Sequence, residues 1–77
     1  MNGKKFGAYV RTNRFQKGLS LIDAADKIGL SQQQLVNIEN GTSSPRPATF
    51  IKIVNGLGLD MKEAINILED GDADATN

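Results

Sequence analysis

The side chains that could do chemistry in this sequence are amides and hydroxyls rather than metal ligands or strong nucleophiles. The 77 residues include no Cys and no His. This composition removes disulfides, thiolate chemistry, the commonest general base and the commonest metal ligand. The serines at 20, 31, 43 and 44 therefore have no histidine to activate them as nucleophiles. We expect no enzyme, no metal site, no cofactor and no small-molecule substrate.

The most informative amides are Gln32, Gln33, Asn37 and Asn40, which fall on the polar faces of one predicted helix. A glutamine amide donates and accepts hydrogen bonds together, so it can pair with N6 and N7 of adenine in the major groove of DNA. The same residue types also suit an ordinary solvated helix surface. Residue type and spacing alone favour the solvated surface.

The charges of the chain are unevenly distributed. The nine basic and nine acidic residues cancel over the whole chain. Residues 1–52 carry eight basic and three acidic side chains, a net charge of +5, and residues 53–77 carry one basic and six acidic side chains, a net of −5. Such asymmetry points either to nucleic-acid or membrane contact by the basic part, or to a solvated surface with an acidic solubilising tail.

The amino-terminal segment does not have the pattern of a signal peptide. Lys4 and Lys5 precede a short apolar run that stops at Arg11. No stretch approaches the roughly 20 apolar residues of a membrane span. We expect a cytoplasmic protein without a membrane partner.

Helical periodicity dominates the chain, and it predicts five short helices and no strand. The predicted helices cover residues 4–16, the interval from Ser20 to Gly29, the interval from Ser31 to Gly41, the stretch from Pro47 to Gly56–Gly58, and the stretch from Asp60 to Leu68. Ser20, Ser31 and Asp60 are predicted N-caps, each followed three residues later by an acidic residue or Gln. Because each apolar stripe is too short to stabilise an isolated helix, the five helices must share one core.

The carboxyl-terminal helix carries its predicted inward face on Met61, Ala64, Ile65 and Leu68. Beyond it the chain is acidic and has no apolar anchor, a composition typical of disorder. We expect one domain over residues 1–69 and a disordered acidic tail over residues 70–77.

Two positions in the second predicted helix suit a sharp helix–turn–helix. Ala25 is small enough for a close helix crossing, and Gly29, four residues later, tolerates the positive φ that a tight turn requires. Many helical hairpins share this spacing, so it does not identify a family.

The longer pattern is more specific. Gly18-Leu19-Ser20, the run from Ala25 to Gln33, and Ile38-Glu39-Asn40-Gly41 occur in this order before a loop that ends at Pro47. Over about residues 5–69 the sequence resembles the phage-repressor and Cro family of helix-turn-helix domains, also called the Xre family. The resemblance implies an all-α, compact, five-helix lambda-repressor-like domain, with the helix-turn-helix at its second and third helices. It also implies a sequence-specific DNA-binding transcriptional regulator, most simply a repressor.

The resemblance also implies roles for individual residues. The base contacts would come from Gln32, Gln33, Val36 and Asn37 on the third helix. The phosphate contacts would come from Arg11, Asn40, Thr42, Ser43, Ser44 and Arg46. In similar domains an Arg late in the first helix pairs with a Glu near the end of the third, which implies a structural ion pair between Arg14 and Glu39.

Two further expectations concern partners. We expect a homodimer on double-stranded DNA with a palindromic operator, and Ile67, off the core stripe of its helix, is the candidate dimer contact. Leu21 departs from the family, since many members carry at this position a Gln that binds a phosphate. This departure and the zero net charge leave open an alternative: a protein-interaction module of the same fold, such as an antitoxin-like or adaptor protein, that binds DNA weakly or not at all.

Overall fold

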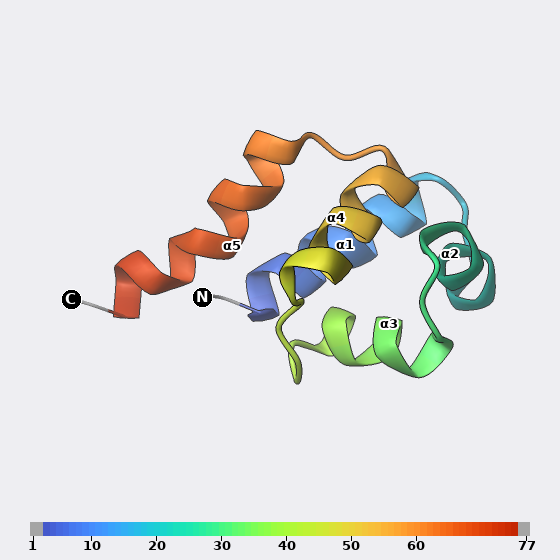
Figure 1. Ribbon diagram of the computed structural model, residues 1–77, viewed down its shortest axis with the longest axis horizontal. Helices are drawn as coiled ribbons and strands as arrows, with labels where there is room; N and C mark the ends of the chain where they lie inside the picture. Colours follow the sequence, from blue (N-terminus) through green and yellow to red (C-terminus); the bar gives the residue numbers. More distant parts are fainter. Residues whose placement is uncertain (1–2, 76–77) are drawn as a thin grey trace.

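The computed structural model describes the backbone of residues 3–75 and the side chains of residues 3–69. Within this part of the chain there are five α-helices and no strand (Figure 1). The helices are α1 (Gly3–Gln16), α2 (Leu21–Ile28), α3 (Gln32–Asn40), α4 (Pro47–Leu57) and α5 (Met61–Ala75). The predicted all-α, five-helix architecture is therefore confirmed. None of these helices is both long and apolar enough to cross a membrane.

Three helices begin at the caps that the sequence predicts. The Ser20 hydroxyl accepts a hydrogen bond from the Asp23 backbone N–H at 3.1 Å, and an Asp60 carboxylate oxygen accepts from the Glu63 N–H at 2.9 Å. At α3, Ser31 and Gln34 form a complete capping box, with bonds of 3.1 and 2.9 Å. These bonds satisfy N–H groups that a helix start otherwise leaves without a partner.

The turn between α2 and α3 depends on Gly29. Its φ of 92° lies in the left-handed region that side chains with a Cβ rarely adopt. The N–H groups of Gly29 and Leu30 both donate to the Ala25 carbonyl, at 2.8 and 2.9 Å. Ala25 itself is buried. Ala25 and Gly29 therefore allow the sharp turn that their spacing predicts.

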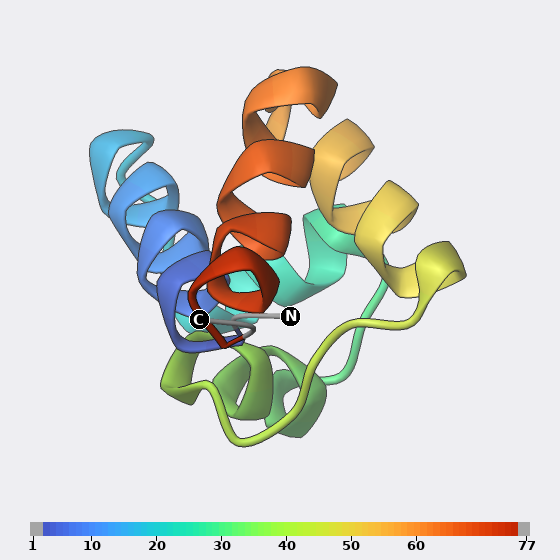
Figure 2. The ribbon, with the colours of Figure 1, turned by 90° about the vertical axis from the view of Figure 1, so that its left-hand side faces the viewer.

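One apolar core joins all five helices. Its buried members are Phe6, Val10, Ala24, Ala25, Ile28, Leu35, Ile38, Phe50, Ile53, Val54, Leu57 and Ala64. The rings of Phe6 and Phe50 lie 5.4 Å apart between centroids, so aromatic packing joins α1 to α4. Figures 1 and 2 both place α3 and the following loop at the lower edge of the molecule, and the amino-terminal turns of α5 at the upper edge.

The inward face of α5 differs from the predicted one. Ala64 is fully buried, whereas Met61 and Ile65 are each 38% exposed. Leu68 is partly buried against the core, as predicted, and so is Ile67, which was not predicted to be. The helix packs against α1, and Ala64 faces the core together with the positions three and four residues later, whereas Met61 and Ile65 lie at the margin of this face. The predicted placement of Ile67 off the core stripe is therefore wrong.

Helix α5 also extends past its predicted end at Leu68, to Ala75. The backbone of residues 70–75 continues the helix. The side chains of residues 70–77, and all of residues 76–77, lie outside the described part of the structure. The acidic tail over residues 70–77 accordingly stays a prediction.

A tyrosine links α1 to the first turn of α5. The Tyr9 hydroxyl donates a hydrogen bond to a Glu63 carboxylate oxygen at 2.8 Å. Burial of the ring, the hydrogen bond and the nearby negative charge all favour the neutral phenol, and they raise the pKa of Tyr9 from its ordinary value of 10.0 to about 12.

This pKa predicts a specific loss of stability at high pH. The phenol ionises near pH 10 in the unfolded chain and near pH 12 in the folded one, so its contribution is fully present below about pH 10. It should be lost as pH rises from about 10 to 12. Tyr9 is the only tyrosine, and the chain has no Trp, so tyrosinate absorbance reports this group alone.

The matched control is Tyr9→Phe, which keeps the ring and removes the titrating group. The difference in unfolding free energy between the two proteins should shrink across that pH range. A titration midpoint near 10 in the folded protein would contradict the assignment.

Candidate nucleic-acid interface

The amino-terminal half of α3 presents amides to solvent. Gln32, Gln33 and Gln34 are exposed, whereas Leu35 and Ile38 are buried against the core. The helix therefore lies at the lower edge of the molecule with its apolar side held by α1 and α2 (Figures 1 and 2).

The four predicted base-contact residues are not equally accessible. Gln32 and Gln33 are exposed, but Val36 and Asn37 are half-buried. The Gln33 amide nitrogen donates to the Asn37 amide oxygen at 3.0 Å. The neighbouring Gln34 amide oxygen is occupied by the capping box. Gln32 and Gln33 are thus the α3 amides best placed to meet an external partner.

The loop after α3 forms a polar groove beside the helix. The groove has a volume of about 360 Å³ and is lined by Gln34, Asn37, Ile38, Ser43, Ser44, Pro45, Arg46 and Thr49. Three predicted phosphate-contact residues, Ser43, Ser44 and Arg46, therefore lie next to the half-buried Asn37. Arg46 is exposed and precedes α4, whose first residue is Pro47 as predicted. This arrangement gathers hydroxyls, amides and one cation at the edge of the α3 surface.

Thr42, another predicted phosphate contact, closes the carboxyl end of α3. Its N–H and its hydroxyl both donate to the Asn37 carbonyl, at 3.0 and 3.1 Å. A hydroxyl has only one proton to donate, so in this conformation Thr42 cannot also donate to a phosphate. The sequence does not reveal this use of the side chain.

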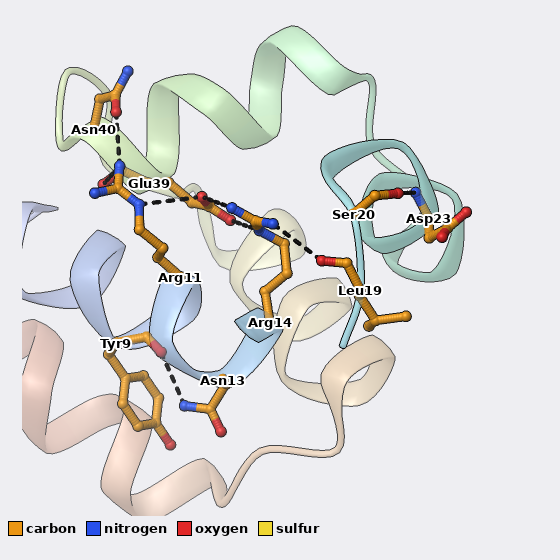
Figure 3. A network of polar contacts seen from close by, with 9 residues as sticks. All are labelled: Tyr9, Arg11, Asn13, Arg14, Leu19, Ser20, Asp23, Glu39 and Asn40. Carbon is orange, nitrogen blue, oxygen red and sulfur yellow. Dashed lines mark hydrogen bonds and ion pairs between the residues drawn. The ribbon is translucent and has the colours of Figure 1, made fainter. Parts of the chain in front are cut away.

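A buried ion pair holds α3 against α1. Arg14 and Glu39 are 8% and 5% exposed, and Figure 3 shows the two side chains facing each other. Arg14 Nε donates to Glu39 Oε2 at 2.8 Å, and Arg14 Nη2 donates to Oε1 at 3.1 Å. Arg14 Nη1 also donates to the Leu19 carbonyl at 3.0 Å. The hydrogen bonds to Glu39 raise the pKa of Arg14 above its ordinary value, against the opposing effect of burial.

Arg11 supplies a cation to the carboxyl end of α3. The helix has no basic residue in its own last turn, where positive charge is favourable. Arg11 Nη2 donates to the Asn40 amide oxygen at 2.9 Å and to the Glu39 carbonyl at 3.4 Å, and its Nε lies 3.5 Å from Glu39 Oε1. In Figure 3 the Asn40 amide nitrogen points away from Arg11. Arg11 and Asn40, both predicted to contact phosphates, are thus hydrogen-bonded to each other.

Gly7 permits this close approach of α1 and α3, and its importance is not evident from the predicted apolar run. A Cβ at Gly7 would lie 2.6 Å from the Glu39 carbonyl oxygen and closer still to that of Ile38. Ordinary Cβ atoms essentially never come within 3.0 Å of another group. A glycine inside a predicted helix is the one sequence signal that could have revealed the contact.

Ile67, the predicted dimer contact, lies elsewhere. It lines an open groove of about 520 Å³ between α1 and α5, together with Lys5, Ala8, Tyr9, Thr12 and Asn66. Among the described residues, no group of three or more Asp or Glu side chains could hold a metal ion.

Helices α2 and α3 are short and pack about a turn at Gly29, whose φ is positive. Helix α3 exposes amides at one edge of the domain. This arrangement defines a helix-turn-helix domain. A model of the helix-turn-helix family matches residues 10–63 of this chain. The chain belongs to this family of DNA-binding transcriptional regulators. This finding confirms the resemblance and the fold expected from the sequence.

The relatives include a phage protein and bacterial regulators. The chain is 32% identical to the ImmF control region 10 kDa protein of Bacillus phage phi105, over 96% of this chain and 87% of the relative. It is 35% identical to an uncharacterized HTH-type transcriptional regulator of Mycobacterium tuberculosis, over 97% of this chain but only 29% of that protein.

Solved structures show the same fold. An HTH_3 family transcriptional regulator from Vibrio cholerae superposes with a TM-score of 0.74 at 32% identity, covering 94% of this chain and 38% of that one. The clp gene regulator ClgR from C. glutamicum superposes with a TM-score of 0.76 at 20% identity, covering 90% of each chain. The chain therefore matches some relatives along most of their length and others over less than half of it.

Proposed function

We propose that this protein is a sequence-specific transcriptional repressor that binds a palindromic operator as a homodimer, with α3 in the major groove. The proposal rests on one observation above all: α3 exposes the amides of Gln32 and Gln33, and the same helix lines a polar groove that carries Ser43, Ser44 and Arg46. Base edges are read by such amides, and phosphates are bound by such hydroxyls and cations.

Each part of this surface has a separate task in the proposal. Gln32 and Gln33 enter the major groove of the DNA, because the amino-terminal residues of a recognition helix contact the base edges. Arg46 and the loop serines contact the phosphate backbone and set the register. The buried pair of Arg14 and Glu39 contacts no DNA and fixes the direction of α3.

A homodimer suits a domain of this size. One small module buries about 600–1,000 Å² on DNA, so two modules are the usual route to useful affinity. The two half-sites would lie about 34 Å apart, one helical turn of DNA. We assign the dimer contact to α5, where Met61 and Ile65 are exposed and Ile67 lines the adjoining groove.

The remaining parts of the proposal follow from a DNA partner. A repressor bound to an operator that overlaps a promoter would block transcription, and the similarity to a phage control-region protein supports such a regulatory role. We assign the protein to the cytoplasm, DNA binding to residues 1–69, and a solubilising role to the acidic residues 70–77. No enzymatic step is proposed.

One observation favours a second function, a protein-interaction module that does not need DNA. Leu21 is apolar and half-buried at the start of α2, and Arg11, Asn40 and Thr42 already bond within the protein. These four residues then add little to a phosphate-binding surface. A measurement of DNA binding distinguishes the repressor from the protein-interaction module.

The test is selection of bound sites from random duplex DNA, repeated at two salt concentrations. We expect an enriched inverted repeat at both concentrations, with lower yield at high salt because released counterions favour binding at low salt. If no motif is enriched even at low salt, the DNA-binding proposal fails and the protein-interaction module replaces it.

Arg46→Ala should weaken binding to all DNA sequences alike. Loss of one phosphate contact should reduce the slope of log affinity against log salt by about 1, without changing the selected motif. Affinity measured across a salt series checks this.

Lys62→Ala is the matched control for Arg46→Ala. It removes the same charge from the first turn of α5, which lies away from α3 in both views. An unchanged salt slope for Arg46→Ala, or an equal change for both variants, would exclude the phosphate contact.

A further inference from the structure

We infer that Asn37 is a positioning residue that sets the base preference of Gln33 and does not read a base pair of its own. The inference rests on the proposed function, since it assigns roles within the same α3 surface. It differs from the expectation that Asn37 contacts a neighbouring base directly.

The first support is the contact between the two side chains. Gln33 and Asn37 are four residues apart, hence neighbours on one face of α3. The Gln33 amide nitrogen donates one of its two protons to the Asn37 amide oxygen at 3.0 Å. Gln33 keeps its other N–H and its carbonyl oxygen, the donor and acceptor that pair with adenine N7 and N6.

The second support is the depth of Asn37. Gln33 is exposed, whereas Asn37 is half-buried and lines the polar groove beside Arg46. A partner that approaches α3 from outside therefore meets Gln33 first. Asn37 lies behind it, where its amide oxygen can hold the Gln33 side chain in place.

The third support is the anchoring of Asn37 itself. Its backbone carbonyl accepts two hydrogen bonds from Thr42, at 3.0 Å from the N–H and 3.1 Å from the hydroxyl. Thr42, which follows α3, is thereby bonded back to the Asn37 backbone. These bonds fix the backbone position from which the Asn37 side chain reaches Gln33, and they are made within the protein, without DNA.

The consequence concerns specificity more than affinity. A free glutamine side chain populates many rotamers and can present its amide in either orientation. The bond to Asn37 fixes the orientation of the Gln33 amide, which leaves its second N–H and its carbonyl oxygen for a base. Removal of Asn37 should therefore broaden the preference at the base pair that Gln33 contacts.

The first arm of the test uses the free protein. In NMR spectra, the Gln33 side-chain amide should be ordered in the wild type and should become mobile in Asn37→Ala. Asn37→Asp keeps an acceptor oxygen and should keep Gln33 ordered. A Gln33 side chain that is equally mobile in the wild type and in Asn37→Ala would overturn the inference without reference to DNA.

The second arm measures binding to the selected operator and to operators with single base-pair changes. Asn37→Ala and Gln33→Ala should lose discrimination at the same base pair, by about 5- to 150-fold, and the double variant should lose no more than Gln33→Ala alone. Asn37→Asp should retain the preference at that pair, although its negative charge weakens binding to every sequence.

Gln32→Ala is the matched control, because Gln32 is exposed on the same helix and should affect a different base pair, additively with Asn37→Ala. Lost discrimination at a second base pair in Asn37→Ala, additive with Gln33→Ala, would overturn the positioning role while leaving the proposed function intact. A wild-type protein that selects no site would defeat the proposed function, and the assigned role with it.

Discussion

Glu39→Ala is expected to lower the free energy of unfolding by about 3–5 kcal/mol. The change leaves the buried Arg14, a residue only 8% exposed, without its carboxylate partner. A domain of this kind is stable by only about 5–15 kcal/mol in total, so the loss should be visible as a large shift of the urea midpoint.

Two further variants isolate the cause of this loss. Glu69→Ala removes an exposed carboxylate and should change stability by no more than about 0.5 kcal/mol. The double replacement Arg14→Met with Glu39→Leu removes both charges together and should recover much of the stability lost in Glu39→Ala. A Glu39→Ala protein as stable as Glu69→Ala would contradict the structural role of the pair.

Gly7→Ala should destabilise the protein by about 1–3 kcal/mol, the usual cost of overpacking. The expected change in stability is opposite to the usual one, since a Gly-to-Ala change inside an ordinary exposed helix stabilises a protein by about 1 kcal/mol. Here the added Cβ would overlap backbone carbonyl oxygens of Ile38 and Glu39, which cannot move aside as a flexible side chain could. Helices α1 and α3 must therefore separate.

Thermal or urea unfolding checks the Gly7 prediction, with Ala8→Gly as the neighbouring control. Ala8 is exposed, so its replacement should cost only the helix-propensity difference of about 1 kcal/mol. A displacement of α3 from α1 would also move the proposed DNA-binding surface. Gly7→Ala should therefore weaken DNA binding even at temperatures where the domain remains folded. A Gly7→Ala protein more stable than the wild type would show that the helices do not meet here.

The helices could be predicted from the sequence because their signals are local. Ser31 and Gln34 are three residues apart, and Gly29 sits where the chain must turn, so neither depends on the rest of the fold. The buried face of α5 could not be predicted equally well. Its apolar residues allow two overlapping stripes, and only the packing of α5 against the other helices selects the one that contains Ala64 and Ile67.

The site shows the same limit. The amides and hydroxyls on and after α3 could be named from their types, but their existing hydrogen bonds could not. Arg11 reaches Asn40 across 29 residues of sequence, and no spacing rule connects the two positions. The bond from Thr42 to Asn37 depends on how the loop leaves α3. Tertiary structure therefore decides which of the predicted contact residues remain available to a partner.

We propose that α3 reads DNA through Gln33, whereas the buried pair of Arg14 and Glu39 only holds the helix in place. The most direct measurement is the base-by-base preference of the wild type and Gln33→Ala, obtained by selection from the same random duplex pool. Gln33→Ala should fold normally and lose about 1–3 kcal/mol of discrimination at one base pair of each half-site, with the other positions unchanged. An identical motif from both proteins, or an equal loss of affinity for every sequence, would contradict it.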